Sequence, residues 1–146
     1  MDVQKFIAFF KEINKYDEDN GLEFEIHSPG SITYRMTIQE KHLSSPNITH
    51  GAAIAGMMDC VLGLSALSFA VTQDKLVSTV EFKINYTRPV SLGEELTGHG
   101  NVVHIGKRLV ISSGELRNKA GELVAMGQGT FNTYPASKKD FLDEIK

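Results

Sequence analysis

Asp59 is the one acidic residue in a segment, residues 51–70, whose other side chains are almost all apolar. It is also the only Asp, Glu, Lys or Arg between Lys41 and Asp74. An apolar segment of this length predicts a helix that is buried on all sides. A carboxylate in such a helix is costly unless it is paired, hydrogen-bonded or used chemically. Asp59 is therefore the first candidate for a functional residue.

Turn and cap residues stand directly before this segment, in the sequence Asn47-Ile-Thr-His50-Gly51. The start of a helix leaves backbone N–H groups unpaired and carries a partial positive charge. Such a terminus can bind an oxyanion or polarise a carbonyl oxygen. Because glycine has no side chain, Gly51 would let a ligand come close to that backbone.

The spacing between these two features constrains how they can work together. Asp59 follows Gly51 by eight residues, so it lies ~12 Å further along the same helix axis. One carbonyl group cannot touch both. If they act on one substrate, Asp59 must come from a second chain whose helix runs antiparallel to the first.

One side of the expected helix carries mostly small residues at helical spacing: Ala52, Ala55, Gly56, Asp59 and Gly63. Such a stripe lets a second helix or a ligand approach closely, which makes Ala52 and Gly56 candidate substrate contacts. Tight packing against a sheet would explain the same stripe.

The remaining elements follow from periodicity and turn residues. Apolar residues at helical spacing predict an amphipathic helix over about residues 2–15. Alternation predicts strands at 22–27, 31–40, 80–86, 95–105, 109–118 and 122–134, and in the third of these Val80, Phe82, Ile84 and Tyr86 should face the core. A polar loop, 41–50, precedes the central helix, and the charged tail, 136–146, should be peripheral.

Consecutive hairpins make an antiparallel sheet, and a helix that is apolar all round needs more cover than a flat sheet gives. We therefore expect an α+β fold in which a curved antiparallel sheet wraps around the long central helix. The length of 146 residues fits a single domain over residues 1–146, with its core at about 20–135.

Composition excludes several classes of partner. The net charge is −3 and no dense basic run exists, which argues against nucleic acid. Residues 51–70 could span a bilayer by length, but Asp59 would then lie near the membrane centre. The N-terminus lacks the features of a signal peptide, and the lone Cys60, best explained as a core thiol, fits a reducing compartment, so we expect a cytoplasmic protein. The scattered histidines predict no metal site.

The motifs in their order resemble one family. His50-Gly51, with Asp59 nine residues after the histidine, resembles the H-G-G…D motif of hotdog-fold acyl-CoA thioesterases of the phenylacetate-pathway, PaaI-like type. Four further segments extend the resemblance over about residues 20–135: Tyr86–Pro89, Leu92–Glu94, Gly106-Lys107 and Gly127–Gly129. The resemblance implies a hotdog fold, acyl-CoA as substrate, no cofactor beyond the coenzyme A of the substrate, and a homodimer or homotetramer with active sites at the dimer interface.

The resemblance also implies roles for single residues. The Gly51 N–H would polarise the thioester carbonyl, and Asp59 of the partner chain would activate water or attack directly. Thr79 would help to hold the attacking water, although strict alternation places it on the outer side of its strand, so that its reach requires a bulge or strong curvature. His50 would fix the loop, close to the carbonyl. Asn47 stands three residues before the histidine as the polar helper, and Ala52 replaces the second glycine of the motif.

Coenzyme A carries phosphates, so basic residues in loops should meet it. Arg88, Lys107 and Arg108 are the candidates. Two alternatives to hydrolysis stay open at this point. One is a dehydratase or hydratase on the same fold, which would need a histidine placed to move an α proton. The other is a non-catalytic acyl-CoA-binding or regulatory module, which would gain nothing from a costly acid at position 59.

Overall fold

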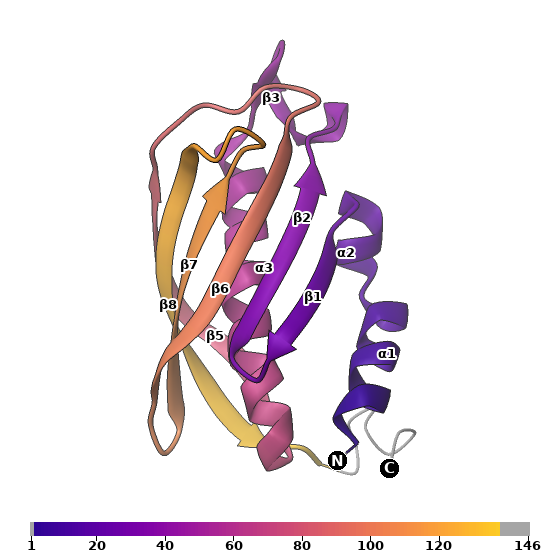
Figure 1. Cartoon of the computed structure of the whole chain (residues 1–146), viewed down its shortest axis with the longest axis vertical. Coiled ribbons are helices and arrows are strands. Elements are labelled where there is room, and N and C mark those ends of the chain that lie inside the picture. Colours follow the sequence, from indigo (N-terminus) through magenta and orange to yellow (C-terminus); the bar gives the residue numbers. More distant parts are fainter. Residues whose placement is uncertain (1, 138–146) are drawn as a thin grey trace.

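The computed structural model describes residues 2–137, and its elements follow one another along the chain as in Figure 1. Two short helices, α1 (Val3–Ile13) and α2 (Lys15–Asn20), precede a hairpin of β1 (Glu23–Ser28) and β2 (Ser31–Thr37). A 3₁₀ turn (Glu40–His42) and two short strands, β3 (Leu43–Ser45) and β4 (Ile48–Thr49), then lead into the long helix α3 (Gly51–Ala70). A second 3₁₀ turn (Val71–Gln73) is followed by β5 (Lys75–Tyr86), β6 (Glu95–Ile105), β7 (Leu109–Arg117) and β8 (Leu123–Pro135).

Six strands form one antiparallel sheet in the order β1-β2-β6-β7-β8-β5, and α3 lies along one face of it (Figure 1). This confirms the predicted hotdog architecture of a curved antiparallel sheet around a long central helix. The segment Gly51–Gln73 is apolar and long enough to cross a membrane, but 67% of its most apolar stretch is buried inside the fold, as in a core helix. The strands β1 and β5 are the two edges of the sheet.

A row of glycines lets α3 lie close against the sheet. Gly100 on β6 pairs with Gly114 on β7, which pairs with Gly127 on β8. A Cβ atom at Gly100 would stand 2.2 Å from the Ser65 hydroxyl and 2.7 Å from the Val61 carbonyl oxygen. No side chain fits there, so the glycine is required by the approach of the helix.

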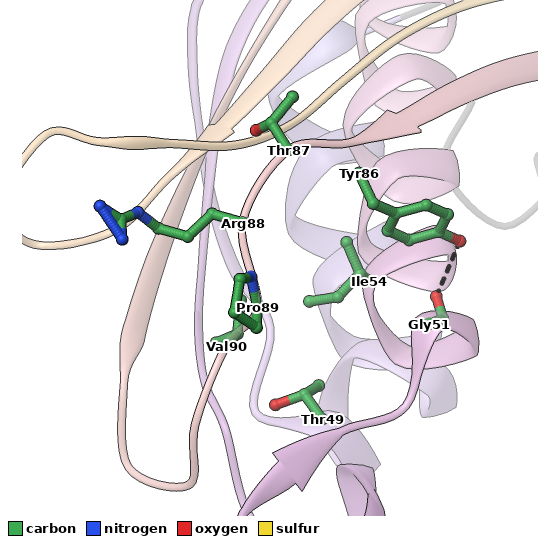
Figure 2. A pocket seen from close by; sticks show the side chains of 8 residues that line it. All are labelled: Thr49, Gly51, Ile54, Tyr86, Thr87, Arg88, Pro89 and Val90. Atoms are coloured by element: carbon green, nitrogen blue, oxygen red, sulfur yellow. Dashed lines mark hydrogen bonds between the residues drawn. The ribbon is translucent and has the colours of Figure 1, made fainter.

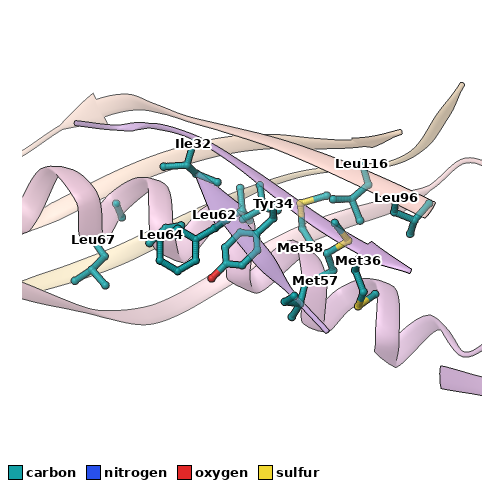
Figure 3. Close-up of a cluster of buried hydrophobic side chains, with 14 of the residues drawn as sticks. Ile32, Tyr34, Met36, Met57, Met58, Leu62, Leu64, Leu67, Leu96 and Leu116 are labelled. Atoms are coloured by element: carbon teal, nitrogen blue, oxygen red, sulfur yellow. The ribbon is translucent and has the colours of Figure 1, made fainter. Parts of the chain in front are cut away.

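The sheet-facing side of α3 forms the centre of the core, shown in Figure 3. Met57, Met58, Val61 and Leu62 are fully buried, and each such side chain stabilises the fold by ~1.5–3 kcal/mol. The opposite side of the helix is not covered in the same way, because Gly51 and Ala52 are exposed and the following small residues are only half-buried. The prediction that one chain buries this helix on all sides is therefore wrong.

The N-terminal segment forms two helices where the sequence predicts one. Asn14 ends α1 and begins α2, because its side-chain oxygen accepts a hydrogen bond from the Asp17 N–H (3.0 Å). On α1, Phe6 is buried and stacks on Phe10 with ring centroids 5.9 Å apart. Phe10 in turn contacts Phe24 of β1, which fixes α1 beside the edge of the sheet.

Other differences from the sequence prediction are local. The strand expected at 31–40 ends at Thr37, and the loop expected at 41–50 contains the 3₁₀ turn and the β3–β4 pair. At the C-terminus, Ala136 donates its N–H to the Asp74 carbonyl (3.1 Å) and packs against the core. Residues 138–146 of the predicted peripheral tail lie outside the described residues.

Candidate active site

Thr79 and Asp59 are brought together by a β-bulge in β5. Thr79 pairs with Phe131 of β8, whereas Glu81 pairs with Thr130, so that Val80 is the extra residue. The bulge turns Thr79 toward the helix, and its hydroxyl donates a hydrogen bond to Asp59 Oδ1 (3.0 Å). Of the two alternatives that the sequence left open, a bulge or strong curvature, the structure shows the bulge. The placement of Val80 on the buried side is wrong, because the bulge leaves it 58% exposed.

The other oxygen of Asp59 is open to a ligand. Within residues 2–137, no hydrogen bond reaches Asp59 Oδ2. The side chain is half-buried, not fully buried as the sequence predicted. It stands at a hollow that we call the carboxylate pocket, lined by Phe10, Asn14, Tyr34, Asp59, Cys60, Gly63, Leu64, Leu67, Val77, Thr79 and Phe131. One carboxylate oxygen is thus held by a hydroxyl while the other is free to take a proton.

The start of α3 presents one unpaired amide. His50 caps the helix, because its Nδ1 accepts from the Ala52 N–H (2.8 Å) and its carbonyl accepts from the Ala53 N–H (3.0 Å). As an acceptor at Nδ1, the neutral His50 ring carries its proton on Nε2. In the described part of the chain the Gly51 N–H has no hydrogen-bond partner. The positive end of the helix therefore offers this N–H to a ligand.

The fold itself does not require a glycine at position 51. Gly51 is not among the residues with a left-handed backbone. A Cβ atom there would lie 3.6 Å from the Tyr86 ring, which is ordinary contact. The absence of a side chain leaves the backbone at the helix start accessible from outside the chain. Gly56 differs, because a Cβ atom there would come within 2.1 Å of the Tyr16 hydroxyl.

A second hollow, the amide pocket, opens beside Gly51 with a volume of about 310 Å³. Figure 2 shows its lining: Thr49, Gly51, Ile54, Tyr86, Thr87, Arg88, Pro89 and Val90. The Tyr86 hydroxyl donates to the Gly51 carbonyl (3.0 Å) and so holds the end of β5 against the helix start. The Thr49 hydroxyl is buried and has no hydrogen-bond partner among the described residues.

Sequence reasoning did not assign roles to Thr49 or Tyr86. In the sequence, Tyr86 is the last apolar residue of an alternating strand and the first residue of one segment that carries the family resemblance, and Thr49 is a turn residue. Their positions depend on how β5 and the β3–β4 pair meet the helix. No local sequence signal carries that information.

The two pockets share no lining residue. Gly51 and Asp59 are separated by ~12 Å along α3. Each chain therefore holds two separate features along α3: an unpaired N–H at the helix start, and a carboxylate held by a threonine hydroxyl.

Comparison with known proteins decides the family. The sequence model of the thioesterase superfamily matches residues 46–125, which is more than half of the chain. The chain belongs to the thioesterase superfamily. The matched segment contains Gly51, Asp59 and Thr79, but neither α1 nor α2.

Relatives agree with this assignment. A putative esterase of Archaeoglobus fulgidus is 28% identical over 101 residues, and the match spans 69% of this chain but only 63% of that protein. Human acyl-coenzyme A thioesterase 13 is 30% identical over 105 residues, covering 70% of this chain and 73% of the human protein. The structure of the E. coli PaaI protein, from the phenylacetic acid degradation operon, shares the fold with a TM-score of 0.81 at 18% identity, covering 92% of this chain and 95% of that one.

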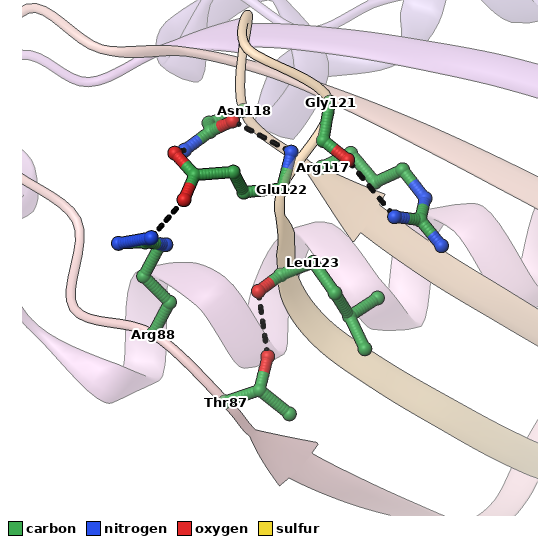
Figure 4. Close-up of polar contacts among 7 residues, drawn as sticks. All are labelled: Thr87, Arg88, Arg117, Asn118, Gly121, Glu122 and Leu123. Carbon is green, nitrogen blue, oxygen red and sulfur yellow. Dashed lines mark hydrogen bonds and ion pairs between the residues drawn. The ribbon is translucent and has the colours of Figure 1, made fainter.

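The three basic residues predicted to bind coenzyme A do not lie together in this member of the superfamily, but at opposite ends of the molecule. Arg88 lines the amide pocket, but its guanidinium points away from Gly51 and forms an ion pair with Glu122 (Figures 2 and 4). Lys107 and Arg108 form the β6–β7 turn, at the opposite end of the molecule from the start of α3 (Figure 1). A single chain therefore does not bring the three cations together.

Two further candidates have structural roles. Asn47 adopts a left-handed backbone (φ 60°), and its side-chain oxygen accepts from the Leu92 N–H (3.3 Å). It lines neither pocket, so the structure gives it a turn role. The hydroxyl of the exposed Tyr16 side chain lies where a Cβ atom of Gly56 would stand, whereas Ala52 remains exposed beside the unpaired amide. Among residues 2–137 no group of three or more His, Cys, Asp or Glu side chains is placed to hold a metal ion.

A buried polar group that the sequence did not reveal lies behind the carboxylate pocket. Asp17 of α2 is 6% exposed, and it accepts hydrogen bonds from the Tyr34 hydroxyl (2.7 Å) and the Cys60 thiol (3.8 Å). Burial raises the pKa of Asp17, and these two hydrogen bonds oppose that shift. Burial also raises the pKa of the Cys60 thiol, with the Asp17 and Asp59 charges acting in the same direction. Cys60 is thus a protonated structural thiol.

The raised pKa of Asp17 predicts how stability depends on pH. The folded protein holds a proton at Asp17 more tightly than the unfolded chain does, so stability is lost as pH rises from ~3.9 through the folded-state pKa. Asp17→Asn removes this loss and keeps an oxygen for the Tyr34 hydroxyl. The free energy of unfolding of wild type minus that of Asp17→Asn should fall with pH and then level off. Urea unfolding between pH 4 and 8 measures this, with the exposed Asp19→Asn as control. A difference that grows with pH would contradict the shift.

Proposed function

We propose that this protein hydrolyses acyl-CoA thioesters, releasing the free acid and coenzyme A, at sites built from two copies of the chain. The observation that carries the proposal is the pair of complementary half-sites on α3. One offers an unpaired N–H for a carbonyl oxygen, and the other offers a carboxylate with one open oxygen. The relative named acyl-coenzyme A thioesterase 13 supports the substrate class.

The uncovered surfaces support an antiparallel dimer. β5 is a sheet edge of 12 residues, and long open edges of this kind are usually covered. The exposed Val80 and the exposed start of α3 add apolar surface to the same side. Pairing β5 with its copy would set the two α3 helices side by side and antiparallel. The Gly51 of one chain would then face Asp59 of the partner subunit, and the amide pocket would join the partner's carboxylate pocket. Two such dimers would form a tetramer.

Metal-free hydrolysis follows from these groups. The thioester carbonyl oxygen accepts the Gly51 N–H, which stabilises the negative charge that develops there. Asp59 Oδ2 takes a proton from a water molecule that attacks the carbonyl carbon, while Thr79 holds Oδ1. Collapse of the tetrahedral intermediate breaks the C–S bond. The CoA thiolate leaves and takes up a proton, and the acyl group leaves as the acid.

In an alternative mechanism, Asp59 itself attacks the thioester carbonyl carbon as a nucleophile. An isotope experiment distinguishes this mechanism from general-base catalysis. In a single turnover in ¹⁸O-labelled water, general-base catalysis places the label in the product acid alone. Nucleophilic attack passes through a mixed anhydride, and hydrolysis of that anhydride at the Asp59 carbonyl labels Asp59 and not the product.

A panel of aryl, short and long acyl-CoA thioesters, assayed by release of free thiol, tests the function. Turnover with any of them, lost in Asp59→Asn, supports hydrolysis. Binding of acyl-CoA without thiol release would instead identify a binding module. A hydratase needs a histidine that can move an α proton, whereas His50 Nδ1 is engaged in the helix cap.

The β6–β7 turn predicts a separate effect on coenzyme A. In the antiparallel dimer this turn would lie at the same end as Gly51 of the partner subunit, near its Arg88. The double substitution Lys107→Ala and Arg108→Ala should raise KM for acyl-CoA and leave kcat nearly unchanged, as expected for uniform binding. The increase should shrink with added salt, because exposed phosphate contacts are screened. Lys5→Ala, at an exposed lysine on α1 away from β5, is the control. Equal KM values for wild type and the double variant would remove both residues from the site.

A further inference from the structure

The carboxylate pocket extends from Asp59 along α3 toward its C-terminal end, past Gly63 and Leu67. Its volume is about 260 Å³. We propose that this pocket receives the acyl group and limits it to an uncharged, apolar group of at most ~9 non-hydrogen atoms, at ~30 Å³ for each. Phe10 and Gly63 would set the limit. The inference rests on the proposed thioesterase function and specifies its substrate class.

The size of the pocket sets the first restriction. Nine heavy atoms correspond to an acyl chain up to about octanoyl, or to one aromatic ring on a short linker. Longer chains must leave part of their length outside the pocket. Each methylene that enters the pocket can strengthen binding by up to about fourfold. We expect this gain to stop near eight carbons, where the pocket is full.

The charges set the second restriction. Asp59 is the only charged side chain in the lining. The polar atoms of Tyr34 and Cys60, which also line the pocket, are both bonded to Asp17. Among the described residues that line the pocket there is no cation to pair with a second carboxylate, and burying an unpaired charge is costly. Malonyl and succinyl groups should therefore be poor substrates.

Part of the pocket lining comes from outside the segment matched by the family model. Phe10 lies on α1, whereas the match to the thioesterase superfamily begins at residue 46. Stacking on Phe6 and contact with Phe24 hold the Phe10 ring in place. The acyl limit is thus set in part by a helix that lies outside the segment matched by the family model.

Gly63 keeps the pocket open on the helix side. A Cβ atom there would meet the Phe131 ring at 3.5 Å, an ordinary contact, and Gly63 does not have a left-handed backbone. Alanine would also improve helix stability by ~0.5–1 kcal/mol. Neither packing nor backbone conformation therefore requires this glycine. The space that it leaves belongs to the pocket.

Chain-length profiles of kcat/KM from acetyl-CoA to palmitoyl-CoA test the proposal. The wild-type optimum should lie at six to eight carbons. Gly63→Leu fills the pocket, so the ratio of kcat/KM for octanoyl-CoA to that for acetyl-CoA should fall at least about tenfold. Phe10→Ala should move the optimum to longer chains, whereas the neighbouring Phe9→Ala, outside the lining, should not. Gly63→Ala, which fits the fold, should lie between wild type and Gly63→Leu.

A binding measurement separates failure of this inference from failure of the function. The affinity for the non-hydrolysable thioether S-octyl-CoA should also fall at least about tenfold in Gly63→Leu. This result would support the pocket even if no thioester were hydrolysed. An unchanged octanoyl profile and an unchanged thioether affinity in a folded Gly63→Leu protein would overturn the proposal, with the thioesterase function left standing.

Discussion

Asp59→Asn is expected to lower kcat for acyl-CoA hydrolysis by about 10²–10⁴-fold, the usual contribution of a positioned acid–base group. Asparagine keeps an oxygen that can accept the Thr79 hydroxyl, so the local structure should be retained. It cannot take a proton from water. The melting temperature should hold or rise, because a half-buried charge is removed. Steady-state kinetics with thiol detection, together with thermal unfolding, measure both effects.

Substitutions at Thr79 provide the matched control for this result. Thr79→Ser keeps the hydroxyl that bonds to Asp59 Oδ1, whereas Thr79→Val removes it at nearly the same shape. Activity should be close to wild type in the first variant and clearly reduced in the second, by less than in Asp59→Asn. Wild-type turnover in Asp59→Asn would remove Asp59 from the chemistry.

Gly51→Val should have the second large effect, a loss of kcat/KM of about 10²–10³-fold, comparable to the removal of one oxyanion donor. The valine side chain covers the N–H that faces the ligand. The fold should survive, because the Cβ position makes only ordinary contact with Tyr86. Gly51→Ala should give an intermediate loss. A folded Gly51→Val protein with wild-type kcat/KM would show that no substrate approaches this amide.

Much of this architecture could be predicted from the sequence because its signals are local. The apolar run fixes the helix at residues 51–70, as observed in α3, and the turn at Gly106-Lys107 fixes the β6–β7 hairpin. The alternation placed Thr79 on the outer side of its strand, which indicated that a bulge or strong curvature is needed for it to reach the helix, and the structure shows a bulge.

The rest depends on contacts that local patterns do not contain. Periodicity assigned Val80 to the core because it cannot locate the extra residue of a bulge. The burial of Asp17 depends on Tyr34 and Cys60, which lie far from it in the sequence. The prediction that one chain buries α3 on all sides failed for a different reason. An apolar helix surface indicates that something covers it, but not whether the cover comes from the same chain or from another.

The central claim is that one active site takes Gly51 from one chain and Asp59 from another, and mixing two inactive variants tests it most directly. Asp59→Asn and Gly51→Val homodimers should each be nearly inactive. Refolding a one-to-one mixture makes about half of the dimers mixed, and each mixed dimer has one site with both lesions and one with neither. If sites act independently, activity should recover to roughly a quarter of wild type. No recovery, with mixed dimers shown to form by native mass spectrometry, would mean that the two groups act within one chain or not together.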